Sequence, residues 1–379
     1  MKRKMNKITM LSLIAIMLAA LLITGCAKEK GTIKIGAIGP LTGGGASWGE
    51  SDRNAIELAV EEINNAGGIN GRLLQVIHED GKCNGKDAVN AASKLITLDN
   101  VKIILGGVCS AETLAFAPIA EQNKVITFTI ATAPDVSNAG DYVFRNAASD
   151  LEGGRIGAKM IEEDRIALIS ENTEYAMGIQ HTLKEELQNQ GKAIVADLVY
   201  DSDETDFRTY LLKIKNARPE AIFINPGTST SSAGEIAKQM VELGMEDIKV
   251  YGNLLIGSKE SLEIAGDALE GAKYFDAVNI GMTEKGAEFL SKYKQRFGTS
   301  PANDFYTGAR YDSVYIIADA LRECGENSGC IKDYLYKMQP YNGVIGTYTF
   351  DSNGDVIGIP WTIKEIRSGQ SEIIDIITI

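Results

Sequence analysis

The stretch that decides the fold is IKIGAIGPLTGGGASWGESDRNAIELAVEEINNAGGINGRLLQVIHED, residues 33–80. It opens with an apolar run, passes through a glycine-rich loop into an amphipathic segment, and ends in a second apolar run. Apolar residues from Ile56 to Ile63 follow the i, i+3, i+4, i+7 spacing of a buried helix face, and the pair Gly67-Gly68 is a typical helix stop. The stretch therefore predicts a strand, a loop, a helix and a second strand.

The same alternation continues along the rest of the chain. Further β-branched runs are VKIIL, VITFTI, RIALIS, AIVADLVY, EAIFIN and IKVYG, and helical stretches cover about 86–98, 174–189, 205–215, 230–243, 284–296 and 307–323. Strands that alternate with helices predict an α/β architecture with parallel sheets. Eight or more strands exceed one compact core, so we expect two α/β lobes.

The glycine-rich loop fails both common nucleotide motifs. In the dinucleotide fingerprint G-x-G-x-x-G, counted from Gly43 and Gly45, the third glycine is replaced by Trp48. In the phosphate-loop pattern, the position of the lysine is taken by Glu50. We instead interpret Ser47 to Glu50 as a capping box at a helix start, with Trp48 as a candidate ligand contact.

The N-terminus is typical of an export signal. MKRKMNK precedes an apolar run over residues 8–23, which is too short to span a membrane and ends at Thr24-Gly25-Cys26. The motif resembles a lipobox, in which the cysteine is lipidated. We therefore expect a signal peptide over 1–25 and a tether over 26–31. Lipidated Cys26 would hold the protein at the outer face of the cell membrane or in the periplasm.

Charge narrows the classes of partner. The formal net charge is −13, and removing the four basic residues of the signal peptide would make it −17. Such an acidic surface repels nucleic acid and anionic lipid. We expect a soluble, monomeric body with no nucleic-acid partner and no cofactor.

Setting Cys26 aside, the exported part has four cysteines, Cys83, Cys109, Cys324 and Cys330. An even number in an exported chain predicts two disulfides, and pairing 83 with 109 and 324 with 330 closes the shortest loops. A four-ligand metal site is the alternative, although no CxxC spacing appears and only two histidines are present.

Enzyme motifs are missing from the sequence. His78 and His181 have no triad spacing, and neither G-x-S-x-G nor HExxH occurs. We therefore do not predict an enzyme, although a secreted hydrolase or dehydrogenase stays as a third hypothesis.

Together these stretches resemble type I periplasmic binding proteins of the branched-chain amino-acid receptor group, the substrate-binding components of ABC importers. The resemblance covers about residues 32–365. It is carried by residues 33–80 and by KCNGKDAVNAASKL, ILGGVCSAET, ITFTIATAP, RNAASD, TDFRTYLLKIK, ARYDSVYIIADAL and FDSNGD. Members of the family have a disulfide that matches Cys83 and Cys109.

The resemblance implies two Rossmann-like lobes joined by three hinge crossings. The N-terminal lobe would hold 32–149 plus 277–357, and the C-terminal lobe 150–276 plus 358–379. Solute would bind in the cleft as the lobes close, and an ABC permease would receive it.

It also implies the binding residues. Ser110 and Thr132, with the backbone beside them at Ala131, would hold a ligand carboxylate by hydroxyls and free backbone amides. Ordinary helix or turn caps are the alternative for both hydroxyl residues. Side chains implied to line the cleft are Trp48, Tyr175, Thr228, and Tyr306 or Phe305.

One position departs from the family. Its receptors hold the ligand ammonium with a second-lobe acid, and the matching residue here is Leu254. Asp150, Glu204 or Asp276 would have to replace that acid. A buried ammonium without an anion costs several kcal/mol. The expected solute is a branched-chain or other hydrophobic amino acid. The alternatives are an aromatic or other organic acid without an amine, or a sensor role feeding a membrane kinase.

Overall fold

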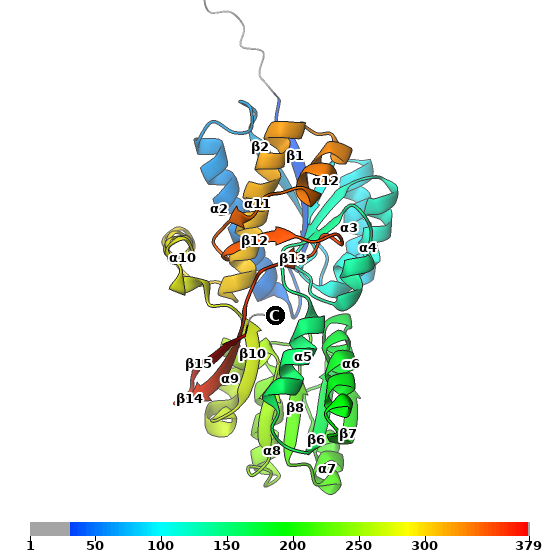
Figure 1. Ribbon diagram of the computed structural model, residues 1–379, viewed down its shortest axis with the longest axis vertical. Coiled ribbons are helices and arrows are strands. Elements are labelled where there is room, and N and C mark those ends of the chain that lie inside the picture. The colour runs from blue at the N-terminus through cyan, green and yellow to red at the C-terminus, as the bar shows by residue number, and fades with distance from the viewer. Residues whose placement is uncertain (1–30, 378–379) are drawn as a thin grey trace, which may run out of the picture.

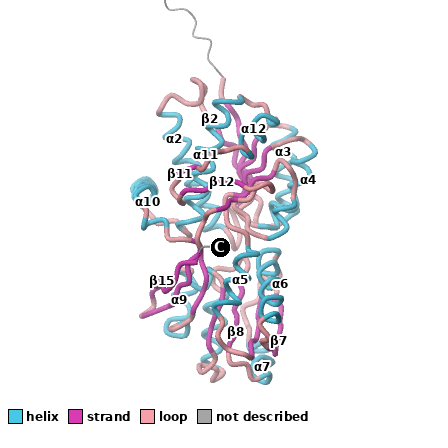
Figure 2. The backbone as a smooth tube through the Cα atoms, viewed as in Figure 1, coloured by secondary structure: helices cyan, strands magenta, loops and turns pink. Residues whose placement is uncertain are grey.

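The computed structural model describes residues 31–377, so the predicted signal peptide and Cys26 lie outside the described part. Two lobes lie one above the other, each built around a mainly parallel sheet that helices cover on both faces (Figures 1 and 2). Within residues 31–377, no helix combines the length and apolar character needed to cross a membrane. The predicted α/β class with two lobes is confirmed.

The first sheet has the strand order β2-β1-β3-β4-β5, with every neighbouring pair parallel. Alternate residues of β1 face opposite sides: Ile35 packs against α2 and α11, and Ile38 against α3 and α4. The strands are β1 (Ile33–Gly39), β2 (Leu74–Asp80), β3 (Ile103–Leu105), β4 (Ile126–Thr129) and β5 (Val143–Arg145).

Helices and a small ribbon complete this lobe. Its helices are α2 (Ala46–Asn65), α3 (Gly85–Thr97), α4 (Ser110–Gln122), α10 (Glu284–Phe297), α11 (Asp304–Cys324) and α12 (Ser328–Tyr336), with 3-10 turns η1 (Pro134–Asn138) and η4 (Ile280–Met282). The antiparallel ribbon contains β11 (Tyr341–Asn342), β12 (Thr347–Phe350) and β13 (Val356–Ile357).

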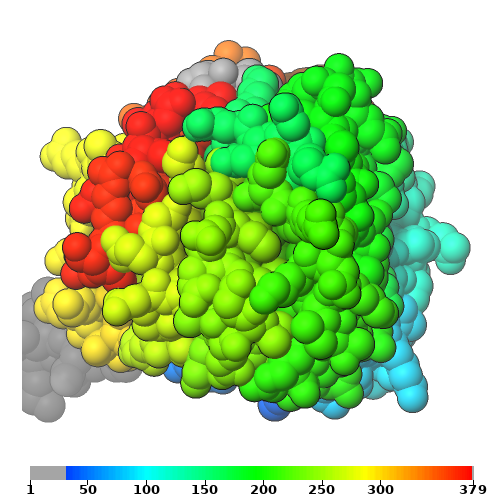
Figure 3. All heavy atoms as spheres, turned by 90° about the horizontal axis from the view of Figure 1, so that it is seen from below, coloured from blue at the N-terminus to red at the C-terminus, as the bar shows by residue number. Residues whose placement is uncertain are grey.

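The second sheet has the order β15-β14-β10-β9-β8-β6-β7. Its strands are β6 (Arg165–Glu171), β7 (Ala193–Tyr200), β8 (Ala221–Asn225), β9 (Lys249–Gly252), β10 (Lys273–Ala277), β14 (Trp361–Arg367) and β15 (Gln370–Ile377). Around it lie α5 (Asp150–Met160), α6 (Glu174–Asn189), α7 (Arg208–Ala217), α8 (Ser232–Glu242) and α9 (Lys259–Ala265), with η2 (Leu254–Gly257) and η3 (Gly266–Leu269). Viewed from below, β14 and β15 form one side of the lobe (Figure 3, red).

The chain passes between the two sheets three times, after β5, after β10 and after β13. The predicted three crossings are therefore present, whereas the residue boundaries given for the two lobes stay a prediction. All eight apolar runs form strands. The sequence did not indicate β5, β10 or the antiparallel edge β14–β15, nor the helices α4, α5, α9 and α12.

The predicted capping box at Ser47 to Glu50 is wrong. Helix α2 begins at Ala46 with Gly45 as its N-cap, and no side chain caps it. The Gly45 carbonyl already accepts from the amides of Trp48 and Gly49, both at 3.1 Å, so the helix starts earlier than the motif suggests. A side chain at Gly45 would come within 2.8 Å of Cys83 Sγ, which explains why a glycine occupies the cap.

Both predicted disulfides are present, Cys83–Cys109 and Cys324–Cys330. The pairing occupies all four sulfurs and so overturns the metal-site alternative. Within residues 31–377, no cluster of three His, Cys, Asp or Glu side chains is placed to hold a metal ion.

Close packing at the start of α2 gives a stability prediction for Gly49→Ala. A Cβ at Gly49 would lie 1.9 Å from the Pro40 carbonyl oxygen, so the loop must move. We expect urea denaturation to show a loss of about 1–3 kcal/mol in unfolding free energy. The matched control is Gly44→Ala in the same loop, where a Cβ meets no atom within 4 Å and stability should be nearly unchanged. Equal stability of the two variants would contradict this packing.

Candidate ligand-binding cleft

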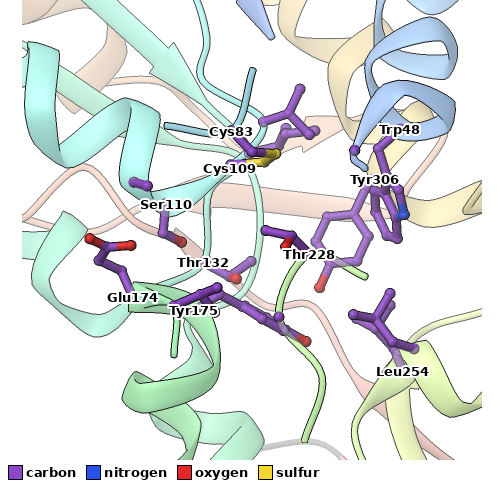
Figure 4. A pocket seen from close by; sticks show the side chains of 17 residues that line it. Trp48, Cys83, Cys109, Ser110, Thr132, Glu174, Tyr175, Thr228, Leu254 and Tyr306 are labelled. Atoms are coloured by element: carbon purple, nitrogen blue, oxygen red, sulfur yellow. A yellow bond between two sulfur atoms is a disulfide. The ribbon is translucent and has the colours of Figure 1, made fainter. Parts of the chain in front are cut away.

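A cavity of about 100 Å³ lies between the lobes (Figure 4). The segments that follow β1, β3 and β4 form its upper wall, and those that follow β6, β8 and β9 form its lower wall. Ligands of open α/β sheets bind at such carboxyl ends. The cavity is lined by Gly45, Trp48, Cys83, Val108, Cys109, Ser110, Ala111, Ile130, Thr132, Thr173, Glu174, Tyr175, Gly227, Thr228, Leu254, Leu255 and Tyr306.

The N-terminus of α4 presents hydrogen-bond donors to this cavity. Cys109 is its N-cap, and the first amides to bond back to the Cys109 carbonyl are those of Glu112 and Thr113. The helix therefore leaves the amides of Ser110 and Ala111 free. The Ser110 hydroxyl oxygen accepts from the Ala133 amide at 3.1 Å, so its proton can be donated to a ligand. Among the described residues that line the cavity, none is a lysine, arginine or histidine, so the donors at this point of the wall are neutral groups.

Glu112 fixes this helix start from behind. Its carboxylate is fully buried and accepts from the amides of Cys83 (3.1 Å), Val108 (3.1 Å) and Cys109 (3.0 Å). These bonds and the Cys83–Cys109 disulfide connect the loop after β2 to the loop after β3. The donors at Ser110 are thereby held rigidly.

The loop that carries Thr132 is held by the buried guanidinium of Arg145, on β5. Arg145 donates to the carbonyls of Thr132 (3.0 Å) and Ala133 (2.9 Å) and to Ser137 Oγ (2.8 Å). It also forms a two-point ion pair with Asp355, at 2.8 and 2.7 Å. Asp355 precedes the third crossing, so one side chain connects the ligand loop to a hinge strand.

In the lower wall, Glu171 holds a cavity-lining loop in place by hydrogen bonds. Its buried carboxylate accepts from the amides of Gly227 (2.7 Å), Thr228 (3.1 Å) and Ser229 (3.3 Å), and from Thr228 Oγ1 (2.6 Å). The lone pairs of Glu171 are thus committed to the loop after β8, and Thr228 is presented to the cavity.

Aromatic side chains close the remaining sides. The rings of Trp48 and Tyr306 are 5.7 Å apart, and Tyr175 crosses the floor of the cavity with its hydroxyl toward Leu254 (Figure 4). The Tyr175 hydroxyl is buried and has no hydrogen-bond partner among the described residues. Phe305 instead lines a larger adjoining hollow of about 690 Å³, which shares Trp48, Leu254 and Leu255 with the cavity.

Three of the implied residues have other environments. Ala131 is not in the lining, and its amide is already bonded to Thr129 Oγ1 at 2.9 Å. Glu204 lies in the loop between β7 and α7, where its carboxylate accepts from the amides of Thr205 and Asp206. Asp276 pairs with Lys364 at 2.6 Å in the adjoining hollow.

Asp150 lies behind Thr132 and is only 1 % exposed. Its amide donates to the Thr132 carbonyl at 2.8 Å, and its carboxyl oxygen Oδ2 has no partner among the described residues. Burial raises the pKa of this carboxyl to about 7, against the opposing effects of Thr132 and the charge of Arg145. Asp150 is thus screened from the cavity and is not in its lining.

Sequence reasoning missed several lining residues, among them Ile130, Glu174 and Leu255. Ile130 belongs to an apolar run that predicts a strand, so it gave no sign of lining a cavity. Nothing in the sequence distinguishes Leu255 from its neighbour Leu254. Glu174, the only acid in the lining, is exposed at the rim and looked like an ordinary first-turn acid of α6. The adjacent Tyr175 was the only available signal for this segment.

Comparison with known proteins agrees with this geometry. The family model described as "periplasmic binding protein" matches residues 32–370. The chain belongs to this family.

A periplasmic binding protein of Pseudomonas aeruginosa, a leucine-, isoleucine-, valine-, threonine- and alanine-binding protein, is 29% identical over 92% of this chain and 94% of its own length. A leucine-binding protein from Thermotoga maritima has a TM-score of 0.82 at 26% identity, covering 92% and 99% of the two chains. The substrate-binding protein of a Streptococcus pneumoniae branched-chain amino acid transporter, in complex with isoleucine, has a TM-score of 0.81 at 27% identity with the same coverage. All three are named as binding proteins, and this chain is a substrate-binding receptor.

Arg145→Lys tests whether the guanidinium positions the Thr132 loop. A lysine cannot serve two carbonyls, Ser137 and both oxygens of Asp355 at once. We expect urea denaturation to show a loss of about 3 kcal/mol. The matched control is Arg155→Lys, in an exposed pair with Glu152, which should change stability by less than about 0.5 kcal/mol. An Arg145→Lys protein as stable as the control would overturn the positioning role.

Asp150 predicts how stability changes with pH. Because its folded pKa is about 7 and its ordinary value 3.8, the folded protein binds a proton between these values that the unfolded chain has lost. The bound proton stabilises the folded protein fully below pH 4. This stabilisation is lost as the pH rises to 7, and the free energy of unfolding falls by at most about 1.4 kcal/mol per pH unit. Urea denaturation from pH 4.5 to 8 should show a flatter profile for Asp150→Asn than for the wild type. Parallel profiles would contradict the buried neutral carboxyl.

Proposed function

We propose that the protein captures a small monocarboxylate with a branched or aromatic apolar body and delivers it to an ABC permease. The observation that carries this proposal is the set of free donors at Ser110 and Ala111, which face a cavity lined mainly by apolar and aromatic side chains. Free amides at a helix start stabilise an anion without a basic residue.

The lower wall favours a solute without an α-ammonium. Leu254 is 8 % exposed and lines the cavity beside Leu255, and Ile130 faces them from the first lobe. Glu174 lies at the rim, and the carboxylate of Glu171 is bonded to the loop after β8. An ammonium in this wall would lose its hydration without gaining an anion, at a cost of several kcal/mol.

A branched-chain amino acid is the second candidate. It is favoured by the relatives from Pseudomonas aeruginosa and Streptococcus pneumoniae, whose names describe such ligands. Backbone carbonyls of the lining segments would then have to hold the ammonium.

Export, lipidation at Cys26 and a monomeric state belong to the same proposal. They place the cleft outside the cell, where the receptor would meet its solute and a membrane permease. A sensor feeding a membrane kinase would use the same cleft. Reconstitution with the permease in liposomes separates the two roles, because only a transport receptor makes solute uptake depend on its presence.

Matched pairs of solutes test the ligand class by calorimetry. Leucine is compared with 4-methylpentanoate, and phenylalanine with 3-phenylpropanoate, since each pair differs only by the amine. We expect the amine-free acid of a pair to bind at least tenfold more tightly, and a hundredfold excess over Kd to stabilise the fold by about 2.7 kcal/mol. Tighter binding of the amino acids would establish the second candidate instead.

Two substitutions test the carboxylate site itself. Ser110→Ala and Thr132→Val remove one hydroxyl donor each, and each should weaken binding by about 1.5–3 kcal/mol, the value of a hydrogen bond to a charged group. Thr173→Val, in the same cavity on the opposite lobe, is the control and should have a smaller effect. Failure of every carboxylate to bind the folded protein would refute the proposed function.

A further inference from the structure

A buried acid beside an anion site is unexpected. Asp150 is buried next to Thr132, whose carbonyl accepts from the Asp150 amide at 2.8 Å, and its Oδ2 has no partner among the described residues. Thr132 faces the cavity from the other side. An ionised carboxylate at this position would repel a ligand carboxylate through a poorly hydrated interior, where such repulsion is weakly screened. The two acids are compatible only if one of them carries a proton.

We propose that Asp150 is a positioning residue that couples carboxylate binding to proton uptake. This rests on the proposed function. When neutral, the Asp150 carboxyl donates its proton to Thr132 Oγ1, so that the Thr132 hydroxyl donates its own proton to the ligand. When ionised, Asp150 accepts that hydroxyl proton instead, and Thr132 presents lone pairs to the ligand carboxylate. No bond other than hydrogen bonds changes, and the proton comes from the solvent.

The surroundings of Asp150 agree with this coupling. Arg145, on β5, is the one cation acting on it, and the guanidinium is already engaged with Asp355 and with backbone carbonyls. Tyr175, on α6, and Tyr306, on α11, face the carboxyl, and Asp276, on β10, acts on both tyrosines. Burial raises the pKa of both tyrosines well above the usual value, and Asp150 contributes to the increase. These tyrosines therefore stay neutral, and Asp150 is the group beside Thr132 whose charge changes. Glu112, whose pKa burial also raises to about 7, is bonded to the Cys109 amide and adds a pH dependence that Asp150→Asn leaves in place.

Calorimetry from pH 6 to 8.5 tests the proposal, with 4-methylpentanoate and leucine as probes and the coupling measured on whichever binds. In the wild type we expect binding to weaken about thirtyfold across this range, because the competent, neutral form of Asp150 becomes scarce. Buffers of different ionisation enthalpy should show uptake of up to about one proton per bound ligand near pH 8.

Substitution of Asp150 distinguishes this coupling from a purely structural role, because the two predict opposite changes in ligand affinity. The Asp150→Asn amide can donate to Thr132 Oγ1 at every pH, so this variant should bind more tightly than the wild type at pH 8.5, without proton uptake. Asp135→Asn removes an exposed acid from the same loop, is the matched control, and should keep the wild-type profile. Weaker binding by Asp150→Asn at pH 8.5, or binding by the wild type without proton uptake, overturns the proposal.

A readout without ligand separates this inference from the proposed function. Infrared difference spectra between pH 6 and 9 should contain a carbonyl band of buried protonated Asp150 that is missing in Asp150→Asn. A band from Glu112, whose pKa burial also raises to about 7, should remain in both spectra. If neither probe binds but the Asp150 band is present, the proposed ligand class fails and the neutral Asp150 stands. If the Asp150 band is absent from the wild-type spectrum, the coupling proposal fails even when a carboxylate binds.

Discussion

The cleft depends on the buried guanidinium of Arg145. It bonds to the carbonyls that flank Thr132, to Ser137 and to Asp355, and these groups belong to segments more than 200 residues apart in sequence. A charge removed from water is tolerated only with such complete pairing. The arrangement fixes the ligand loop of the first lobe relative to the strand that enters the third crossing. Glu112 and Glu171 do the same for the other two loops, so the candidate ligand contacts are held by buried polar side chains outside the cavity lining.

Much of this architecture is visible in the sequence, because it depends on local patterns. Apolar runs and helical spacing indicated eight of the ten parallel strands, all but β5 and β10, and the spacing from Ile56 to Ile63 identified the buried face of α2. The antiparallel edge of the second sheet was not indicated, because β14 and β15 are joined by a short turn at the chain end and pairing order leaves no mark in periodicity. The capping-box motif failed since Gly45 packs against the disulfide, a contact between distant residues.

The candidate binding residues also divide into those that the sequence indicated and those that it did not. Motifs placed Ser110, Thr132, Trp48, Tyr175 and Tyr306 together, and the structure puts all five in one cavity. The roles of Glu112, Arg145 and Glu171 could not be inferred, because each depends on hydrogen bonds to residues that lie near it only in the folded chain. Asp150 was considered as an ammonium partner from its sequence position. Its placement behind Thr132, rather than in the lining, required the fold.

The absence of basic side chains from the cavity lining has a consequence for capture in solution. The chain has a formal net charge of −13, so the proposed carboxylate solute would be repelled at long range and attracted only on contact with neutral amides. At 0.1 M salt this repulsion is screened beyond about 10 Å. The neutral amides carry no counter-ion that a ligand would have to displace. A receptor built on lysine or arginine loses affinity as salinity rises. This one would capture its anion faster in brine than in fresh water.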